Sequence, residues 1–224
     1  MTRPRAAAMR FVRSLPGDVQ LAVHPVYSPL IEIVGLAPDV TFGPGDTAIF
    51  TSANGVENSV ARPGHRAYCV GHATMGAALN RGWHAIQTGV DADDMVRRLL
   101  HMRPDQRLIH LSGTHTRGNV VARLRDAGLR AERVAVYDQR LLPLTADAQA
   151  IIAKGGPVLA PIFSPRTAQQ FAKTLQRPTC VHVIAMSLAV AEPLVDIGLA
   201  GVYVAAAPDA RSMGAELSAV LARL

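Results

Sequence analysis

Short apolar runs alternate with helix-forming stretches along most of the chain, and this alternation is the feature that most limits the fold. Parallel strands need a crossover connection, usually a helix, so the pattern predicts an α/β protein with parallel sheets covered by helices. The expected strands span residues 48–51, 67–70, 107–111, 158–163, 181–185 and 202–206, and the expected helices span 55–61, 73–81, 93–101, 119–126, 167–175, 188–197 and 212–224.

Two segments, residues 27–34 and 133–144, are extended, β-branched and interrupted by proline. We interpret them as strands that pass between two lobes, because 224 residues suffice for two domains of about 100 residues each. The expected organisation has a cleft between the lobes. Lobe 1 comprises residues 1–26 and 145–224, lobe 2 comprises residues 37–131, and residues 27–36 and 132–144 form a two-stranded linker.

The two halves also resemble each other, which predicts two similar lobes. In the first half Ser52 ends a strand and opens a helix, and Thr74 follows 22 residues later. In the second half Ser164 has the same setting, and Ser187 follows 23 residues later.

Composition indicates a folded protein, since 49% of the residues are hydrophobic and 18% are charged. The formal net charge is +6, and all basic residues except Lys154 and Lys173 are arginines. Arginine suits an anionic partner, a codon bias toward arginine is the simpler explanation of the excess, and the two interpretations can hold together. The arginines are spread along the chain and aromatic residues make up only 4%, so we expect no nucleic-acid partner.

The sequence disfavours membrane-spanning, secreted and metal-binding proteins. No stretch has the roughly 20 apolar residues of a membrane span, and the start lacks the apolar run of a secretory signal. Cys69 and Cys180 stand far apart in apolar stretches, and the histidines form no HxxxH or HExxH pattern, so we expect free thiols and no metal site. A cytoplasmic location is therefore expected.

Four hydroxyl residues lie just past predicted strands, at or near the first turn of the next helix: Ser52, Thr74, Ser164 and Ser187. Capping of the helix N-terminus is one role for such residues. The alternative is anion binding, because helix N-termini beyond the carboxyl ends of parallel strands offer free N–H groups and partial positive charge.

Two further places could carry chemistry. Residues 111–118 form a strand, a small polar turn with Gly113 and Arg117, and the start of a helix, without a P-loop or GxGxxG pattern. Tyr137 is a proton donor in an apolar strand, where a tyrosine either packs or, if it faces a cleft, protonates a leaving group. GxSxG is absent, so hydrolase chemistry has little support.

Taken in order, these motifs resemble the uroporphyrinogen-III synthase family over nearly the whole chain. The motifs are Thr2-Arg3-Pro4, Phe50-Thr51-Ser52-Ala53-Asn54-Gly55-Val56, Val70-Gly71-His72-Ala73-Thr74, Leu111-Ser112-Gly113 with Arg117, Val136-Tyr137, Phe163-Ser164-Pro165-Arg166-Thr167-Ala168 and Pro208-Asp209-Ala210.

The resemblance implies cyclisation of hydroxymethylbilane, a linear tetrapyrrole with eight carboxylates, to uroporphyrinogen III, with loss of water, inversion of ring D and no cofactor. It implies that Tyr137 is catalytic and that the N-terminal stretch folds onto the C-terminal lobe. We expect a monomer without a membrane partner. The expected substrate-binding residues are Arg3, Ser52, Asn54, Thr74, Gly113, Arg117, Ser164, Arg166 and Ser187.

The chain departs from the family pattern in two places. Met1 directly precedes Thr2, where the family has a few apolar residues that form a first strand, and Met75 and Met186 stand where smaller residues are commoner. We expect a shortened strand or a start further upstream, no transit peptide, and an altered cleft. The alternative function is a non-catalytic two-lobed module that binds a tetrapyrrole or another polyanion.

Overall fold

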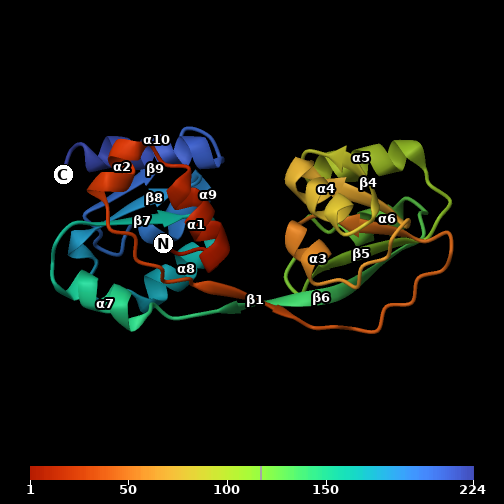
Figure 1. Cartoon of the computed structure of the whole chain (residues 1–224), viewed down its shortest axis with the longest axis horizontal. Helices are drawn as coiled ribbons and strands as arrows, with labels where there is room; N and C mark the ends of the chain where they lie inside the picture. Colours follow the sequence, from red (N-terminus) through yellow and green to blue (C-terminus); the bar gives the residue numbers. More distant parts are fainter. Residues whose placement is uncertain (117) are drawn as a thin grey trace. The chain divides into compact units, whose positions relative to one another are not determined.

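The computed structural model describes residues 1–116 and 118–224, which pack as two compact units (Figure 1). Unit 1 comprises Met1–Glu32 and Arg140–Leu224, and unit 2 comprises Ile33–Gln139. The chain passes from one unit to the other within β1 (Ile31–Gly35) and within β6 (Ala131–Leu141). The N-terminal segment therefore belongs to the same unit as the C-terminal segment.

Unit 2 is built on a six-stranded sheet in the order β1-β6-β5-β2-β3-β4. The inner strands are β2 (Thr47–Phe50), β3 (Arg66–Val70) and β5 (Leu108–Gly113), and they pair in parallel with their neighbours β4 (His84–Gly89) and β6. At the outer side, the N–H of Leu36 donates to the carbonyl of Val136 and the N–H of Leu142 donates to that of Leu30. The partner numbers run in opposite directions, so β1 is antiparallel to β6.

Alternating residues along the strands of unit 2 supply two apolar layers. Ala48, Phe50, Ile109 and Leu111 contribute to one buried cluster, while Ile49 and Leu108 contribute to the other. The first layer is covered by α3 (Ala53–Glu57) and α4 (Gly71–Asn80), and the second by α5 (Ala92–Met102) and α6 (Val120–Asp126).

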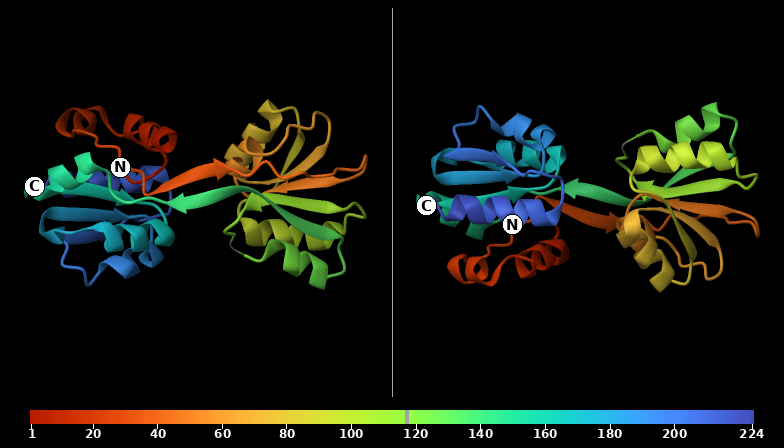
Figure 2. Two further views of the ribbon diagram at one scale, coloured as in Figure 1. Left: turned by 90° about the horizontal axis from the view of Figure 1, so that it is seen from below. Right: turned by 90° about the horizontal axis from the view of Figure 1, so that it is seen from above.

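Unit 1 has a three-stranded parallel sheet in the order β7 (Val158–Ile162), β8 (Val181–Ala185) and β9 (Gly201–Val204), also covered on both faces (Figure 2). One face packs against α1 (Arg5–Arg13), α2 (Gly17–Ala22) and α10 (Ala210–Leu221). The other packs against α7 (Ala146–Ala153), α8 (Pro165–Thr174) and α9 (Leu188–Ala191).

The predicted α/β class with parallel sheets is confirmed, but the two sheets are unequal, with six strands and three. The segments interpreted as a linker, 27–36 and 132–144, contain β1 and all of β6 except Ala131, and both are strands of the six-stranded sheet. Residues 131–137 of β6 pair with β5, so much of this segment is a structural part of unit 2.

Among the α-helices and strands of the described residues, α1, α2, β4 and α7 were not expected from the sequence. β4 lacks an apolar run because it is the outer strand of its sheet and most of its residues are at least partly exposed. The helix expected over 188–197 ends at Ala191, and a 3-10 turn over Glu192–Leu194 follows. Pro193 accounts for the break, since it lacks the N–H that an α-helix requires.

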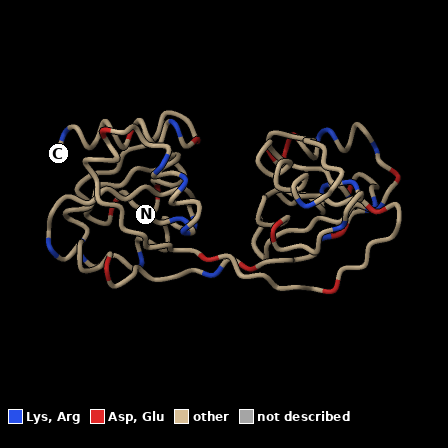
Figure 3. Tube along the Cα trace, viewed as in Figure 1, with Lys and Arg blue, Asp and Glu red and all other residues tan. Residues whose placement is uncertain are grey.

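Within the described residues, no helix is long and apolar enough to cross a membrane. Basic and acidic residues are distributed along both units rather than collected in one segment (Figure 3).

Gly55 allows α3 to lie directly on β5, and this contact yields the first testable prediction. A Cβ atom at Gly55 would lie 2.5 Å from the carbonyl oxygen of Leu111, whereas a Cβ at Gly76 in α4 would meet nothing within 4 Å. We expect Gly55→Ala to lower the free energy of unfolding by about 1–3 kcal/mol, as other overpacked sites do. Gly76→Ala should leave it unchanged or raise it by up to about 1 kcal/mol. Urea denaturation of both variants tests this, and equal effects would contradict the proposed contact.

Candidate functional site

Five of the predicted site residues lie at one edge of the sheet of unit 2, where the parallel strands end. Ser52 and Asn54 follow β2, Thr74 is the fourth residue of α4 after β3, and Gly113 ends β5. Tyr137 pairs with Gly113 in the register between β5 and β6. Parallel pairing thus collects residues from four separate parts of the sequence.

Ser52 caps the N-terminus of α3. Its backbone is extended (φ −155°), and its Oγ accepts a hydrogen bond from the N–H of Asn54 at 3.2 Å. Ser52 therefore has the helix-capping role that was one of its two expected roles. Capping uses the hydroxyl as an acceptor, so the O–H of Ser52 can still donate to another group.

Tyr137 lies against the backbone at Gly113. A Cβ atom at Gly113 would lie 2.7 Å from Cε2 of the Tyr137 ring, so only glycine permits this approach. Tyr137 is only 4% exposed. Its burial raises the pKa of the phenol, while hydrogen bonding with Ser52, with Gln139 and with the backbone of Gly113 acts in the opposite direction. Tyr137 therefore keeps its proton at neutral pH and is connected to Ser52.

The turn that begins after Gly113 is hydrogen-bonded to β6. The N–H of Thr114 donates to the carbonyl of Tyr137 at 2.9 Å, and Thr114 Oγ1 donates to Oδ1 of Asp138 at 2.5 Å. Arg133 Nη2 donates to the carbonyl of Thr114 at 3.0 Å. These bonds fix the start of the turn, whereas Arg117, predicted to bind substrate, lies outside the described residues.

His110 supports the same edge from inside unit 2. Its Nε2 lies 3.0 Å from Oγ1 of Thr51, the residue before Ser52, and its side chain is buried. Burial, with a smaller effect from Arg133, lowers the pKa of His110 to about 4. His110 is therefore neutral at pH 7 and ties the turn after β2 to β5.

Unit 1 carries the remaining predicted residues at the corresponding edge of its own sheet. Ser164 follows β7 and caps α8 by accepting from the N–H of Thr167 at 3.2 Å. Arg166 is the second residue of α8. Ser187 follows β8 at the start of α9 and makes no side-chain capping bond. The unit thus has two helix starts, one with a free cap position, at the carboxyl ends of adjacent strands.

Arg3 is placed at this edge by an aromatic contact. Its guanidinium carbon lies 4.5 Å from the centre of the Phe163 ring, next to Ser164. Burial, together with the charge of Arg10, lowers the pKa of Arg3, which indicates a cation partly removed from water. Such a cation gains from an anionic ligand.

The Thr51–His110 and Thr114–Asp138 pairs were not predicted. Each pair joins residues that are distant in the sequence, and only the order of the strands in the sheet brings them together. In the sequence, Asp138 could have been noticed only because it directly follows Tyr137.

Together these features define a two-unit α/β protein with polar groups at the strand ends of each sheet and a cation, Arg3, at those of unit 1. The uroporphyrinogen-III synthase HemD family model matches residues 19–215, so the chain belongs to this family, as its motifs predicted. No curated protein matches the chain.

Solved structures show the same fold at low identity. Uroporphyrinogen-III synthetase from Helicobacter pylori is 16% identical, with a TM-score of 0.67 over 87% of this chain and 91% of that one. A mutant uroporphyrinogen III synthase from the extremely thermophilic bacterium Thermus thermophilus is 14% identical, with a TM-score of 0.50 over 98% of this chain and 97% of that one. At these identities, the similarities establish the fold alone.

The buried state of His110 predicts a pH dependence of stability. A folded-state pKa of about 4, below the ordinary value of 6.5, means that the unfolded chain takes up the proton first as the pH falls. The stability associated with neutral His110 is thus present above pH 6.5 and is lost toward pH 4, by about 2 kcal/mol between pH 7 and pH 5.

We expect His110→Gln, which can keep a bond to Thr51 but does not titrate, to lose less stability over this range than the wild type. Chemical denaturation at pH 7 and pH 5 measures the difference. His101→Gln, which removes an exposed histidine, is the control and should retain the wild-type decline. An unaltered decline in His110→Gln would show that His110 is not held neutral.

Proposed function

We propose that the protein is a uroporphyrinogen-III synthase that cyclises hydroxymethylbilane with loss of water and inversion of ring D. Membership of the HemD family supports this function, and the observation that carries it furthest is the Ser52–Gly113–Tyr137 cluster. A buried phenol that keeps its proton, at the strand ends of a parallel sheet, is suited to assist the departure of a hydroxyl group.

The substrate requires many anion-binding groups, because it carries eight carboxylates. We propose that the helix starts at Ser52, Ser164 and Ser187, and the first turn of α4 with Thr74, bind some of them through N–H groups and hydroxyls, as helix N-termini bind anions generally. Asn54, the backbone at Gly113, and the cations Arg3, Arg117 and Arg166 complete the proposed set. The contact of Arg3 with the ring of Phe163 supports its role, since Phe163 directly precedes Ser164 in the chain.

Tyr137 is proposed to donate a proton to the leaving hydroxyl. Water then departs, the pyrrole nitrogen supplies the electron pair, and the resulting azafulvenium returns an N–H proton to the tyrosinate, leaving a neutral azafulvene. The burial that raises the pKa of Tyr137 favours this return. The hydroxyl of Ser52, which shares a hydrogen bond with Tyr137, stabilises the transient negative charge.

The remaining steps form and break carbon–carbon bonds within the substrate. The azafulvene is attacked by the substituted carbon of ring D, and the spiro intermediate fragments and recloses with the ring inverted. Hydroxymethylbilane also closes without an enzyme to the other isomer, so the protein has to hold one folded geometry of the chain. Such positioning accelerates intramolecular reactions strongly. These reaction steps involve no net oxidation or reduction, so the proposed reaction needs no redox cofactor.

The proposed activity can be tested by the identity of the product. Hydroxymethylbilane generated in situ should yield uroporphyrinogen III in the presence of the protein, detected after oxidation by chromatographic separation of the isomers. A control without the protein gives isomer I. If the protein also yields isomer I alone, the synthase function is wrong. Tight binding of the substrate in that case would support the non-catalytic alternative.

Tyr137→Phe tests the proposed proton donor. Removal of the hydroxyl should lower turnover at least tenfold, which corresponds to about 1.4 kcal/mol in the activation free energy. Tyr68→Phe is a matched control, because Tyr68 is also buried in the sheet of unit 2 but packs with the cluster under α5. It should retain wild-type turnover. Wild-type turnover in Tyr137→Phe would exclude the catalytic role.

A further inference from the structure

Arg10 lies in α1, within a segment of the chain that carries only positive charge. Residues 1–17 contain four arginines and no acidic residue. In the part of the chain that the structure describes, neither Arg3 nor Arg10 forms an ion pair with an acidic side chain. Arg3 belongs to the substrate-binding groups proposed above, whereas Arg10 does not, so the charge of Arg10 needs an explanation.

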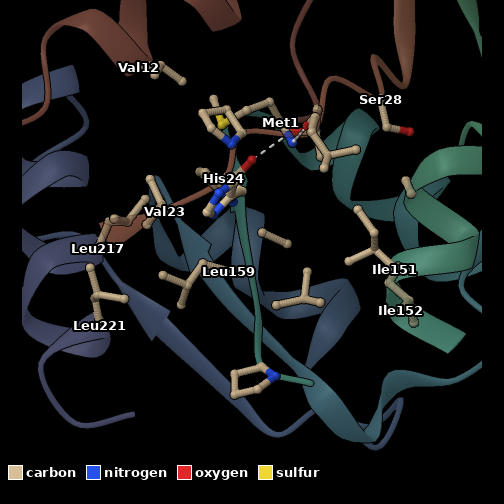
Figure 4. A pocket seen from close by; sticks show the side chains of 18 of the residues that line it. Met1, Val12, Val23, His24, Ser28, Ile151, Ile152, Leu159, Leu217 and Leu221 are labelled. Carbon is tan, nitrogen blue, oxygen red and sulfur yellow. Dashed lines mark hydrogen bonds between the residues drawn. The ribbon is translucent and has the colours of Figure 1, made fainter. Parts of the chain in front are cut away.

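The face of α1 that lies opposite Arg10 packs into unit 1. Val12 lines a mostly aliphatic cavity of about 490 Å³ inside this unit (Figure 4). Residues two positions apart in an α-helix are separated by about 200° around its axis, so Arg10 and Val12 lie on opposite sides of α1. The side chain of Arg10 is accordingly exposed to solvent. It is therefore available to a ligand in solution.

Phe11, the neighbour of Arg10, fixes this part of α1 at the carboxyl ends of the strands of unit 1. The centre of its buried ring lies 5.1 Å from that of the Phe163 ring, in an edge-to-face arrangement. Met186 and Ala205 belong to the same apolar cluster. Phe163, Met186 and Ala205 directly follow β7, β8 and β9. Arg10 thus belongs to the edge of the sheet at which the proposed substrate-binding residues of unit 1 lie.

Arg3 and Arg10 are close enough for their charges to interact. The guanidinium carbon of Arg3 lies 4.5 Å from the centre of the same Phe163 ring. Burial, and after it the charge of Arg10, lowers the pKa of Arg3. Both guanidiniums remain protonated at neutral pH, so the protein keeps two like charges near each other, one of them partly removed from water. A ligand with two negative charges relieves this repulsion.

Two neighbouring carboxylates are the ligand that suits such a pair. A guanidinium donates two parallel N–H groups to one carboxylate, so two arginines can bind two carboxylates. The substrate of the proposed reaction carries eight carboxylates on four pyrrole rings, with an acetate and a propionate on adjacent carbons of each ring. Every ring therefore presents two carboxylates within reach of one another.

We propose that Arg3 and Arg10 bind the two carboxylates of one pyrrole ring of the substrate, one arginine to each carboxylate, at the strand ends of unit 1. This inference rests on the proposed function and adds Arg10 to its binding groups. The contact with Phe163 orders Arg3 before the ligand arrives. Ordering the exposed side chain of Arg10 costs conformational entropy, so its contribution to affinity should be modest.

The test compares two ligands that differ in the number of carboxylates on each ring. One is uroporphyrinogen III, and the other is the porphyrinogen in which methyl groups replace the four acetates. Calorimetric titration of the full chain without oxygen measures both dissociation constants. Arg10→Gln should weaken binding of uroporphyrinogen III about three- to fivefold at low ionic strength. It should weaken binding of the second ligand less than about twofold, because a single carboxylate on each ring leaves Arg10 without a partner.

Arg13→Gln is the matched control. Arg13 is also exposed and, like Arg10, lies in the last turn of α1, where a cation is favoured by the helix dipole. The two variants should therefore unfold at the same urea concentration, while Arg13→Gln binds both ligands like the wild type. Arg223→Gln removes an exposed cation after the end of α10 and controls for the net charge. It should also bind both ligands like the wild type.

Selective weakening of uroporphyrinogen III binding in Arg10→Gln supports the proposal. Equal weakening of both ligands overturns it, as does an effect no larger than that of Arg13→Gln or a wild type that does not bind uroporphyrinogen III.

The isomer assay decides the proposed function separately. If the protein yields isomer III but Arg10→Gln shows no selective effect, only the two-arginine subsite is wrong. If the protein yields isomer I alone although the effect of Arg10→Gln is selective, the synthase function is wrong and the subsite stands.

Discussion

Parallel pairing of β2, β3, β5 and β6 is the constraint on which the candidate site depends. Strands that run in one direction end at one edge, so the turns that follow them meet although they are far apart in the sequence. Each of these turns begins where a backbone leaves the sheet, and unpaired N–H groups accumulate there. The polarity of this edge is therefore a consequence of the topology before any side chain is considered.

The Tyr137–Gly113 contact shows how this edge acquires a particular chemistry. Without a Cβ at Gly113, an aromatic ring can lie on the backbone of β5 and lose most of its contact with water. Desolvation then keeps the phenol protonated, while Ser52 supplies a polar partner. A helix cap, a glycine and a strand tyrosine have ordinary structural roles separately, and their juxtaposition makes them a candidate for acid catalysis.

Much of this arrangement follows from the sequence. The apolar runs predicted the inner strands β2, β3, β5 and β8, which are buried on both faces and need continuous apolar residues, and also the outer strands β7 and β9. β4 is an outer strand with exposed residues, so it has no apolar run and was not predicted. The helices α1, α2 and α7 were not predicted either. Ser52 and Ser164 were identified by their position after a strand, whereas the partners of Thr51 and Thr114 depend on strand order, which no local pattern encodes.

The crossing of the chain within β1 and β6 has a consequence for biosynthesis. Unit 2 is one continuous segment, Ile33–Gln139, and can fold while the ribosome is still adding the rest of the chain. Unit 1 is discontinuous, so Met1–Glu32 has to wait until Arg140 and the residues after it have emerged. At ordinary rates of translation this delay is on the order of ten seconds. During that time α1, α2 and the turn between them expose Phe11, Val19 and Leu15, whose later partners β8 and α10 do not yet exist.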